Sequence, residues 1–385
     1  MKERIASQKR IFKYVLLIFA IVIIIADACL LIMHNKSFSE SENRMLAQAP
    51  KLTVDNLMSG KFMTQSDSFV ADQFPLRDDW IQLKLKADRL LGRQTSNGVY
   101  LGKDGYLIED AAAPLEPSYS KNLAAISLFA NTYPELNMVM TVVPNAVSIC
   151  DQLMPENAPI RDQMEDLAYI QKIANISLDF VDLTDTLKAH KEEYIYYKSD
   201  HHWTSLGAKY AFEEMAPALG IDPSELITDY DIITVADDFT GTMASNSGDF
   251  SVKDSIDIYM AKAEDFQYVV EYVDQQKKSA TIYNSSALEQ KNKYEVFLGG
   301  NHPQINIKTT NLNDRNLMIF KDSYANTFLQ FLLPYYQSIT IIDPRYYSDD
   351  CSKLISEGEI TDVLFLYNMN TYAEDNSLAA VLLDE

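Results

Sequence analysis

NLMIFKDSYANTFLQFLLPYY, residues 316–336, joins an apolar run directly to a segment in which apolar residues recur with helical spacing. The first part, 316–321, has the length and composition of a strand that is buried on both faces of a sheet. Lys321-Asp322-Ser323 follows, and the next residues predict a helix that begins at once. A buried strand that turns directly into a helix is typical of α/β folds.

The same alternation recurs on both sides of this stretch. Residues 137–145 and 361–370 predict buried strands, and 118–133 predicts a helix. Repeated strand–helix–strand units indicate a parallel sheet with helices on both faces. The Asn-Gly and Asp-Gly pairs within 97–109 predict a β-hairpin. Residues 228–312 contain short segments with strand-like alternation, which we interpret as a β-rich insertion.

The N-terminus predicts a membrane anchor. Residues 11–33 are apolar except for Lys13 and Asp27, and this run is long enough to cross a hydrocarbon core of ~30 Å. Four basic residues precede it, so the positive-inside rule places residues 34–385 outside the cytoplasm. A cleaved signal peptide is the alternative, but the run is long for one and no small-x-small cleavage site follows it.

These observations predict four parts of the chain. A basic tail at 1–10 lies in the cytoplasm, and a single-pass transmembrane anchor follows at 11–33. Residues 34–112 form an extracytoplasmic stalk and a packing segment, and residues 113–385 form the α/β domain with its insertion at about 228–312.

Composition excludes some classes of partner. The chain has 55 acidic and 33 basic residues, a formal net charge of −22. This excess argues against nucleic acid and anionic lipid as main partners. Cys150 and Cys351 are 201 positions apart and have no metal-ligand spacing, so we expect them to be buried free thiols rather than part of a disulfide framework or a metal site.

Ser323 lies where the predicted strand ends and the helix begins. In a parallel sheet, sites form at the carboxyl ends of the strands. A serine on this turn presents its hydroxyl near a helix N-terminus, whose free N–H groups, including those near Ser323 and Tyr324, stabilise an oxyanion. The alternative is that Ser323 only caps the helix.

A second strand–helix junction carries Asp200, His201, His202 and Trp203. A nucleophilic serine needs a base, and the base needs a carboxylate that holds its tautomer. His202 and Asp200 supply both on one turn, and Trp203 would wall the site. We rank this interpretation above a metal pair and above inert loop residues. A metal site needs a third ligand, for which His302 and Asp249 are candidates.

Further strand ends offer polar groups for an oxyanion or a substrate. Asn368 and Asn370 are amide donors of the kind that serine hydrolases use, or else turn residues. Arg345 offers a guanidinium to an anionic or carbonyl oxygen, or else forms a structural salt bridge. Asn145, after strand 137–143, is a weaker candidate of the amide kind.

Asp200-His201-His202-Trp203 spells DHHW, and the chain resembles the DHHW protein family. The likeness extends over nearly all of the chain outside the predicted anchor. It is carried by SENR at 41–44, NGVYLGKDGYL at 97–107, FTGTMASNSG at 239–248, FLGGNHP at 297–303, KDSYANTF at 321–328 and IDPRYY at 342–347.

This family is similar to the SGNH-hydrolase-like domains of periplasmic alginate acetylation proteins. The resemblance implies an SGNH-like α/β fold in which Ser323 is the nucleophile, His202 the base and Asp200 the orienting acid, without a metal or another cofactor. Lys321 stands where SGNH esterases have glycine, and no Gly-x-Asn-Asp block is present.

The function that the resemblance implies is O-acetyl transfer to a cell-surface polysaccharide, with a multi-pass membrane acyltransferase as donor partner. An acetyl esterase uses the same serine chemistry with water as acceptor, so sequence alone leaves both open. A glycan-binding or assembly factor with a vestigial triad is the alternative from another class.

Overall fold

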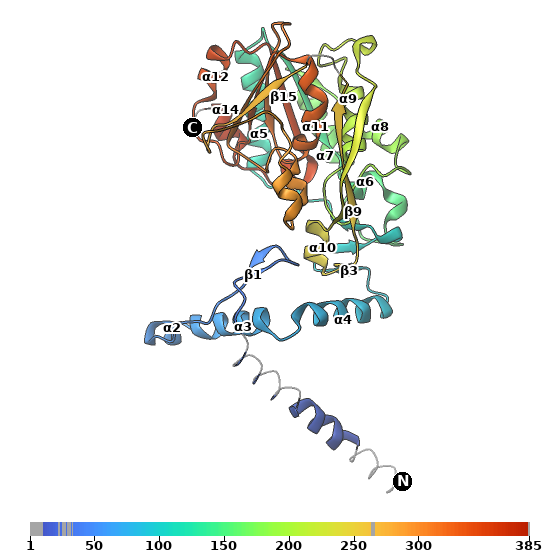
Figure 1. Cartoon of the computed structure of the whole chain (residues 1–385), viewed down its shortest axis with the longest axis vertical. Helices are drawn as coiled ribbons and strands as arrows, with labels where there is room; N and C mark the ends of the chain where they lie inside the picture. Colours follow the sequence, from blue (N-terminus) through green and yellow to red (C-terminus); the bar gives the residue numbers. More distant parts are fainter. Residues whose placement is uncertain are drawn as a thin grey trace. The chain divides into compact units, whose positions relative to one another are not determined.

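The chain divides into two compact units, residues 1–93 and 94–385 (Figure 1). The computed structural model describes residues 11–21, 24, 28, 32, 34–262 and 266–383. The predicted cytoplasmic tail lies outside the described residues, and the predicted anchor is described only in part. In the part that is described, no helix is both long and apolar enough to span a bilayer.

Ion pairs hold a small hairpin onto a helix in the first unit. Arg44 of the SENR motif donates to Asp72 from both Nη atoms, at 2.9 and 2.5 Å, and Asp72 also accepts from the Ala47 main chain at 2.8 Å. Helix α3 ends before Phe74-Pro75, because a residue before proline avoids the helical conformation. The elements are β1 (Phe38–Ser39), β2 (Arg44–Met45), α2 (Val54–Met58), α3 (Lys61–Gln73) and α4 (Arg77–Leu90).

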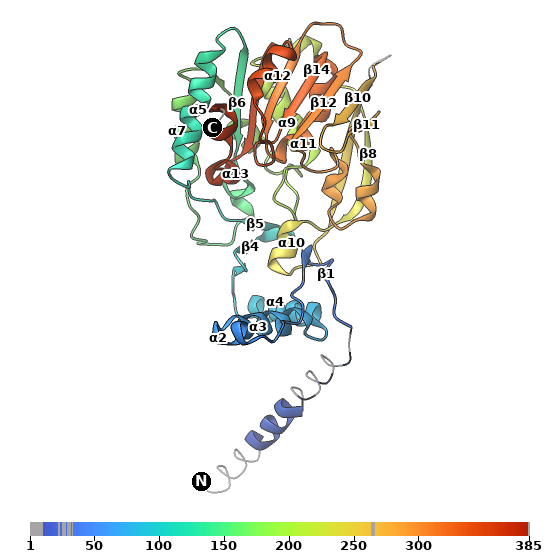
Figure 2. The same cartoon turned by 90° about the vertical axis from the view of Figure 1, so that its left-hand side faces the viewer.

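An eight-stranded sheet forms the centre of the second unit, in the order β11-β10-β12-β14-β13-β15-β6-β7 (Figure 2). The strands from β14 to β7 are parallel. Every residue of β13 is buried, as its apolar run predicts. The parallel strands are β6 (Asn137–Val143), β7 (Asp179–Phe180), β13 (Asn316–Lys321), β14 (Ser338–Ile342) and β15 (Asp362–Asn368).

Two apolar clusters cover the two faces of this sheet. Successive side chains of a strand point to opposite faces, so Val139 joins one cluster and Met140 the other. Helices α9 and α11 contribute to the first cluster, and α5, α12 and α14 to the second. The helices are α5 (Ser118–Thr132), α6 (Ala146–Ile149), α7 (Met164–Ala174), α8 (Thr184–Ala189), α9 (Ser205–Met215), α11 (Tyr324–Leu332), α12 (Cys351–Glu357), α13 (Met369–Glu374) and α14 (Leu378–Leu383), with short 3₁₀ turns η2 (Asp151–Leu153), η3 (Pro223–Glu225) and η6 (Leu333–Tyr335).

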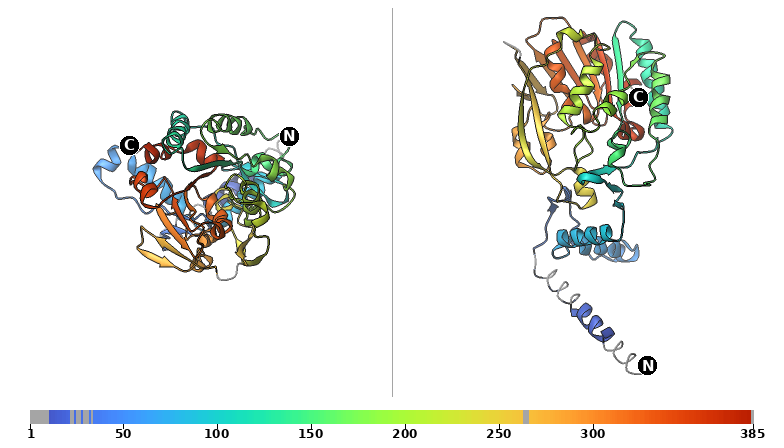
Figure 3. Two further views of the ribbon diagram at one scale, coloured as in Figure 1. Left: turned by 90° about the horizontal axis from the view of Figure 1, so that it is seen from above. Right: turned by 90° about the vertical axis from the view of Figure 1, so that its right-hand side faces the viewer.

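The β-rich segment contributes to two separate sheets. Strands β8 (Tyr230–Phe239) and β9 (Asp254–Ala261) form an antiparallel ribbon, seen in yellow in Figure 3, with α10 (Thr242–Ser247) between them. The other three strands extend the main sheet, where Ile305 of β12 pairs antiparallel with Ile341 of β14. These are β10 (Tyr268–Tyr272), β11 (Lys277–Ser279) and β12 (Gln304–Thr309), with 3₁₀ turns η4 (Ser285–Glu289) and η5 (Lys293–Val296).

The prediction of a parallel sheet is therefore correct only for part of it. The sheet is mixed, because β12 of the insertion pairs antiparallel with the edge of β14, and β10 pairs antiparallel with β12. Antiparallel strands need no long crossover to pair.

The hairpin near the start of the second unit packs on the α/β domain. Ile108 shares an apolar cluster with Val147, and Leu107 shares another with Ala244. The division between units accordingly falls after Arg93, whereas the sequence suggested a boundary after residue 112. The elements are β3 (Thr95–Ser96), β4 (Val99–Leu101), η1 (Lys103–Gly105) and β5 (Leu107–Glu109).

Candidate active site

Residues 195–204 form a closed loop that ends at the start of α9. Tyr196 and Trp203 face each other in an antiparallel bridge, and a main-chain hydrogen bond of 2.9 Å from Thr204 closes the base of the loop. The Thr204 hydroxyl accepts from the main-chain N–H of Gly207 in the first turn of α9 at 3.3 Å, so this residue caps the helix. The tip of the loop, residues 200–202, is thereby held from both sides.

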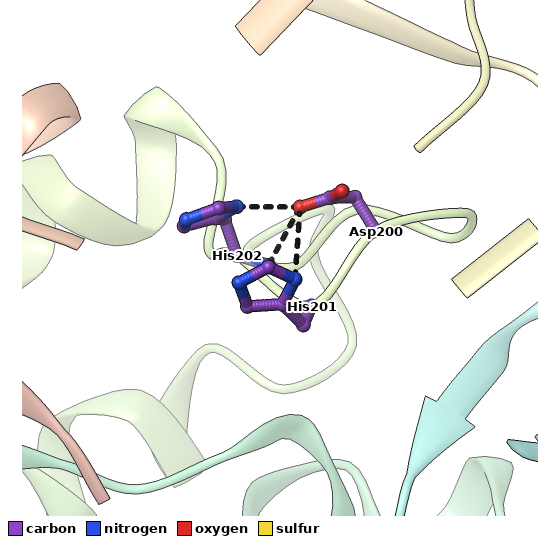
Figure 4. A group of neighbouring side chains, drawn as sticks. All are labelled: Asp200, His201 and His202. Carbon is purple, nitrogen blue, oxygen red and sulfur yellow. Dashed lines mark hydrogen bonds and ion pairs between the residues drawn. The ribbon is translucent and has the colours of Figure 1, made fainter. Parts of the chain in front are cut away.

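The carboxylate of Asp200 is engaged on both oxygens. Oδ1 lies 2.5 Å from His202 Nδ1 and accepts from the His202 main chain at 3.1 Å (Figure 4), while Oδ2 accepts from the Thr242 main chain at 2.8 Å. A Cβ at Gly241 would lie 2.3 Å from the Asp200 Cβ, so glycine is required there. Burial would raise the pKa of Asp200, but His201, His202 and these hydrogen bonds together hold that pKa well below its usual range.

Ser323 lies at the turn between β13 and α11, and its hydroxyl bonds to the histidine loop. Oγ is 2.7 Å from His202 Nε2, which completes a hydrogen-bonded line from Asp200 through His202 to Ser323. The Ser323 side chain makes no cap hydrogen bond. Asp322 takes that role, since its Oδ1 accepts from the Tyr324 main chain at 2.9 Å.

A buried charge cluster surrounds the residue before this turn. Lys321 donates from Nζ to Asn301 Oδ1 at 3.0 Å and to Asn326 Oδ1 at 2.8 Å, and it lies 3.4 Å from Asp343 Oδ2. Burial lowers the pKa of Lys321, although Asp343 opposes this. Arg345 donates to both oxygens of Asp343, at 2.8 and 2.7 Å. Of the two roles considered for Arg345, this is the structural salt bridge.

Two donors, one at the end of β13 and one at the end of β15, have no partner among the described residues. The Tyr324 main-chain N–H is occupied by Asp322, but the Ser323 N–H donates to none of the described residues. Asn368, at the end of neighbouring β15, donates its main-chain N–H to Asp322 at 2.8 Å. Its side-chain Oδ1 caps α13, while its buried Nδ2 has no partner among the described residues. An unpartnered buried donor is costly, and of the three predicted amides only Asn368 has a side-chain donor without a partner among the described residues.

The other predicted amides hold the surrounding loops together. Asn370 donates from Nδ2 to Asp110 O at 2.9 Å and accepts from the Ala112 main chain at 2.8 Å. Asn145 donates from Nδ2 to Glu109 Oε1 at 2.9 Å and accepts from Gln163 Nε2 at 2.8 Å. Both side chains are therefore committed to protein partners.

Trp203 and the side chain of Tyr324 lie inside the core rather than on the site wall. Both are 0% exposed. The Trp203 indole donates to Tyr324 O at 3.0 Å, and the Tyr324 hydroxyl donates to His201 O at 2.5 Å. These two bonds join the histidine loop to the first turn of α11, so Trp203 positions the loop and does not line the access to Ser323.

In the described part of the chain, one group of side chains could hold a metal ion: Asp200, His201 and His202. Neither His302 nor Asp249 belongs to this group. Two ligands of one tetrahedral zinc ion lie about 3.3 Å apart, but Asp200 Oδ1 and His202 Nδ1 are 2.5 Å apart. This spacing suits a shared proton better than a metal ion. His302 instead lies 3.1 Å from Asp274, and Asp249 accepts from Ser251.

Three polar or aromatic contributors to the site were not identified from the sequence. Tyr294 stacks on His202, with ring centroids 3.8 Å apart. Asp254 accepts from the main-chain N–H and the hydroxyl of Ser199, at 2.7 and 2.5 Å, and so supports the loop beside Asp200. Glu109 belongs to the amide network, and burial raises its pKa. None of these positions follows a strand end with a recognisable spacing.

Comparisons with known proteins agree with this architecture. A model of the DHHW protein family matches residues 121–342. The chain is 25% identical over 173 residues to the probable alginate O-acetylase AlgJ of Pseudomonas syringae pv. tomato, a match that covers 42% of this chain and 44% of AlgJ. The match therefore spans less than half the length of that relative.

Solved structures share the fold of most of this chain. A DHHW family protein from Eubacterium siraeum DSM 15702 superposes with a TM-score of 0.64 and 25% identity, over 76% of this chain and 96% of that one. Bacillus cereus PatB1, solved with a sulfonyl adduct, superposes with a TM-score of 0.60 and 19% identity, over 72% of this chain and 98% of that one. At this identity, PatB1 supports the fold alone.

Proposed function

Because this chain belongs to the DHHW protein family, we propose that it is a serine acyl-ester enzyme that transfers acetyl groups to a cell-surface polysaccharide. The observation that carries the proposal is the hydrogen-bonded line from Asp200 through His202 to Ser323. Nucleophile, base and orienting acid stand in the order that the chemistry of a serine triad requires.

In the first half of the reaction, Ser323 Oγ attacks the carbonyl carbon of an acetyl donor. His202 Nε2 accepts the serine proton, and the ionised Asp200 stabilises the imidazolium that forms. The Ser323 N–H and Asn368 Nδ2 donate to the oxyanion. The donor's leaving group then takes the proton from His202, and Ser323 carries the acetyl ester.

In the second half, a sugar hydroxyl gives its proton to His202 Nε2 and attacks the acetyl carbon. The bond to Ser323 Oγ breaks, and the proton returns from His202 to the serine. If water replaces the sugar, the same steps hydrolyse the ester. We favour transfer because curated relatives of the chain are named probable alginate O-acetylases.

The proposal includes a cellular setting. Residues 11–33 anchor the chain in the cell membrane, and residues 34–385 lie on the extracytoplasmic side, where the polysaccharide acceptor is found. A multi-pass membrane acyltransferase supplies the acetyl groups from the cytoplasm. The apolar run and the basic residues before it support this orientation.

Labelling of the intact chain with a fluorophosphonate probe tests the serine chemistry. We expect an adduct on Ser323 by peptide mass spectrometry, with loss of labelling in Ser323→Ala and a decrease of about 10³-fold or more in His202→Asn. His190→Asn is the matched control, because His190 also bonds a carboxylate, that of Glu193, but lies at the surface. Equal labelling of wild type and Ser323→Ala would contradict the mechanism.

Incubation of unlabelled protein with an acetyl donor and an oligosaccharide then distinguishes transfer to sugar from hydrolysis by water. Acetylated sugar identifies a transferase, while release of acetate alone identifies an esterase. A chain that binds glycan but never labels would instead be a binding or assembly factor.

A further inference from the structure

The imidazole of His202 lies between two other rings. Tyr294 stacks on it with a centroid distance of 3.8 Å and an interplanar angle of 14°, and His201 lies at 3.9 Å and 36°. Non-bonded ring atoms cannot approach closer than about 3.5 Å, so two rings at these distances cover opposite faces of the imidazole. Only the edge of the His202 ring is then left to reach Asp200 and Ser323.

Tyr294 also contacts the nucleophile's own main chain. Its hydroxyl donates to Ser323 O at 3.0 Å and is 2.6 Å from Thr327 Oγ1, one turn further along α11. Because Tyr294 needs its proton for Ser323 O, Thr327 is the donor in the second bond. A single side chain thus touches the face of His202 and the residue that His202 must deprotonate.

The position of Tyr294 is itself fixed by packing. It is 4% exposed and lies in η5, part of the β-rich insertion. Its ring centroid lies 5.4 Å from that of Phe297 and 6.2 Å from that of Tyr197. These rings belong to an apolar cluster that also includes Phe239. The ring therefore has little freedom to leave the imidazole.

We propose that Tyr294 is a positioning residue of the active site, which holds the His202 imidazole in register with Ser323 and stabilises its protonated form through the aromatic face. This proposal rests on the proposed serine chemistry. The face of an aromatic ring carries negative charge density, which attracts a cation placed over it. His202 becomes a cation when Ser323 attacks, so the contact strengthens as the reaction proceeds.

Two substitutions separate the ring from the hydroxyl. Tyr294→Phe keeps the stacked face, and we expect it to lower kcat by less than about tenfold. Tyr294→Leu removes the face, and we expect kcat to fall by about 10- to 100-fold with little change in KM. We also expect the acidic limb of the kcat/KM profile to move to lower pH, because an imidazolium without the face is easier to deprotonate.

Other groups near His202 remain in place in both variants, so they do not explain a difference between them. The titratable and charged groups around it are Asp200 and His201 on its own loop, Tyr324 and Asp322 at the start of α11, and Glu109 and Lys291 further out. Tyr283→Leu is the matched control. Tyr283 lies in the same insertion, and its ring centroid is 6.3 Å from that of Phe297. Its hydroxyl donates to Tyr259 O, away from the triad.

Histidine NMR supplies a readout that does not depend on turnover. The full chain has five histidines, and the signal lost in His202→Asn assigns His202. In the Ser323→Ala background, we expect Tyr294→Leu to remove an upfield ring-current shift of that signal and to lower its titration midpoint, with Tyr294→Phe close to the parent. An unchanged His202 signal and unchanged kcat in folded Tyr294→Leu would overturn the proposal. An inactive parent with the expected NMR changes would overturn only the proposed function.

Discussion

At the turn after β13, one residue caps the following helix and the next one carries the proposed nucleophile. Lys321 lies in the strand, in register with Leu366, and residues 321–323 all have negative φ. Glycine is therefore not required where SGNH esterases carry it. Asp322 caps α11, and this leaves the Ser323 hydroxyl free to bond His202.

The residues of the candidate triad could be predicted because Ser323 follows the buried strand β13 and because Asp200 and His202 stand two residues apart just before α9. The strand predicted before Asp200 is only an isolated bridge between Tyr196 and Trp203 in the structure. The roles of their neighbours could not, because these depend on contacts between distant segments. Asn370 looked like a donor to substrate until its partners at residues 110–112 were known. Tyr294 lies in a 3₁₀ turn whose sequence has no periodic pattern, so only the folded chain reveals its contact with His202.

Glu109 provides a prediction about stability and pH. Burial raises its pKa, so the native state holds this proton more tightly than the unfolded chain does. Ionisation of Glu109 therefore does not reduce the stability of the native state below the unfolded pKa of about 4.3, and it does reduce that stability as the pH rises above this value. We expect Glu109→Gln, which can still accept from Asn145, to raise Tm by about 1–3 °C at pH 7 and to leave it unchanged at pH 3.5. Thermal unfolding at both pH values measures this.

The control for that comparison is Glu156→Gln, an exposed glutamate of the same unit. It should leave Tm unchanged at both pH values. A Tm shift of equal size at pH 3.5 and pH 7 in Glu109→Gln would show that ionisation is not its cause.

At the scale of elements, the parallel strands could be recognised because burial on both faces leaves a continuous apolar run, as in β13 and β6. The strands β10 and β12 alternate in the ordinary antiparallel way, and that pattern does not say which edge they join. Their pairing with β14 is a contact between distant segments, and it turns the predicted parallel sheet into a mixed one.

The junction before α10 provides a prediction at this scale. Gly241 has an ordinary φ of −86°, so its role is to leave room for Asp200 rather than to relieve backbone strain. We expect Gly241→Ala to displace the Asp200 carboxylate and to lower esterase activity on p-nitrophenyl acetate by about 10²-fold or more. Kinetics on the folded variant, verified by circular dichroism, measure the effect.

Thr242→Ala is the control at the neighbouring position. Thr242 contacts Asp200 through its main-chain N–H, and its side chain is exposed, so this substitution should preserve activity. Full activity in Gly241→Ala would mean that the Asp200 loop adapts to the added methyl group and that the close approach is unimportant for catalysis.

For the whole molecule, the proposed orientation determines which residues can meet a polysaccharide outside the cell. It also determines which thiols an impermeant maleimide can reach on intact cells. Cys150 and Cys351 are 2% and 4% exposed, as the sequence predicts, and burial raises the pKa of Cys150 to about 12. Neither thiol should react in the folded chain, because the thiolate is the reactive form and needs access to the reagent.

A cysteine introduced on the exposed surface of α7 therefore tests the orientation directly. Cys29, the third cysteine of the chain, is first replaced by serine in both proteins. If the second unit is extracytoplasmic, Lys172→Cys should then be labelled on intact cells to the same extent as on lysed cells, and the parent with Cys29→Ser should give only background. If the unit is cytoplasmic, labelling of Lys172→Cys will appear only after lysis. That second result would overturn the proposed orientation and leave the chain without access to an extracellular acceptor, whatever the chemistry of Ser323.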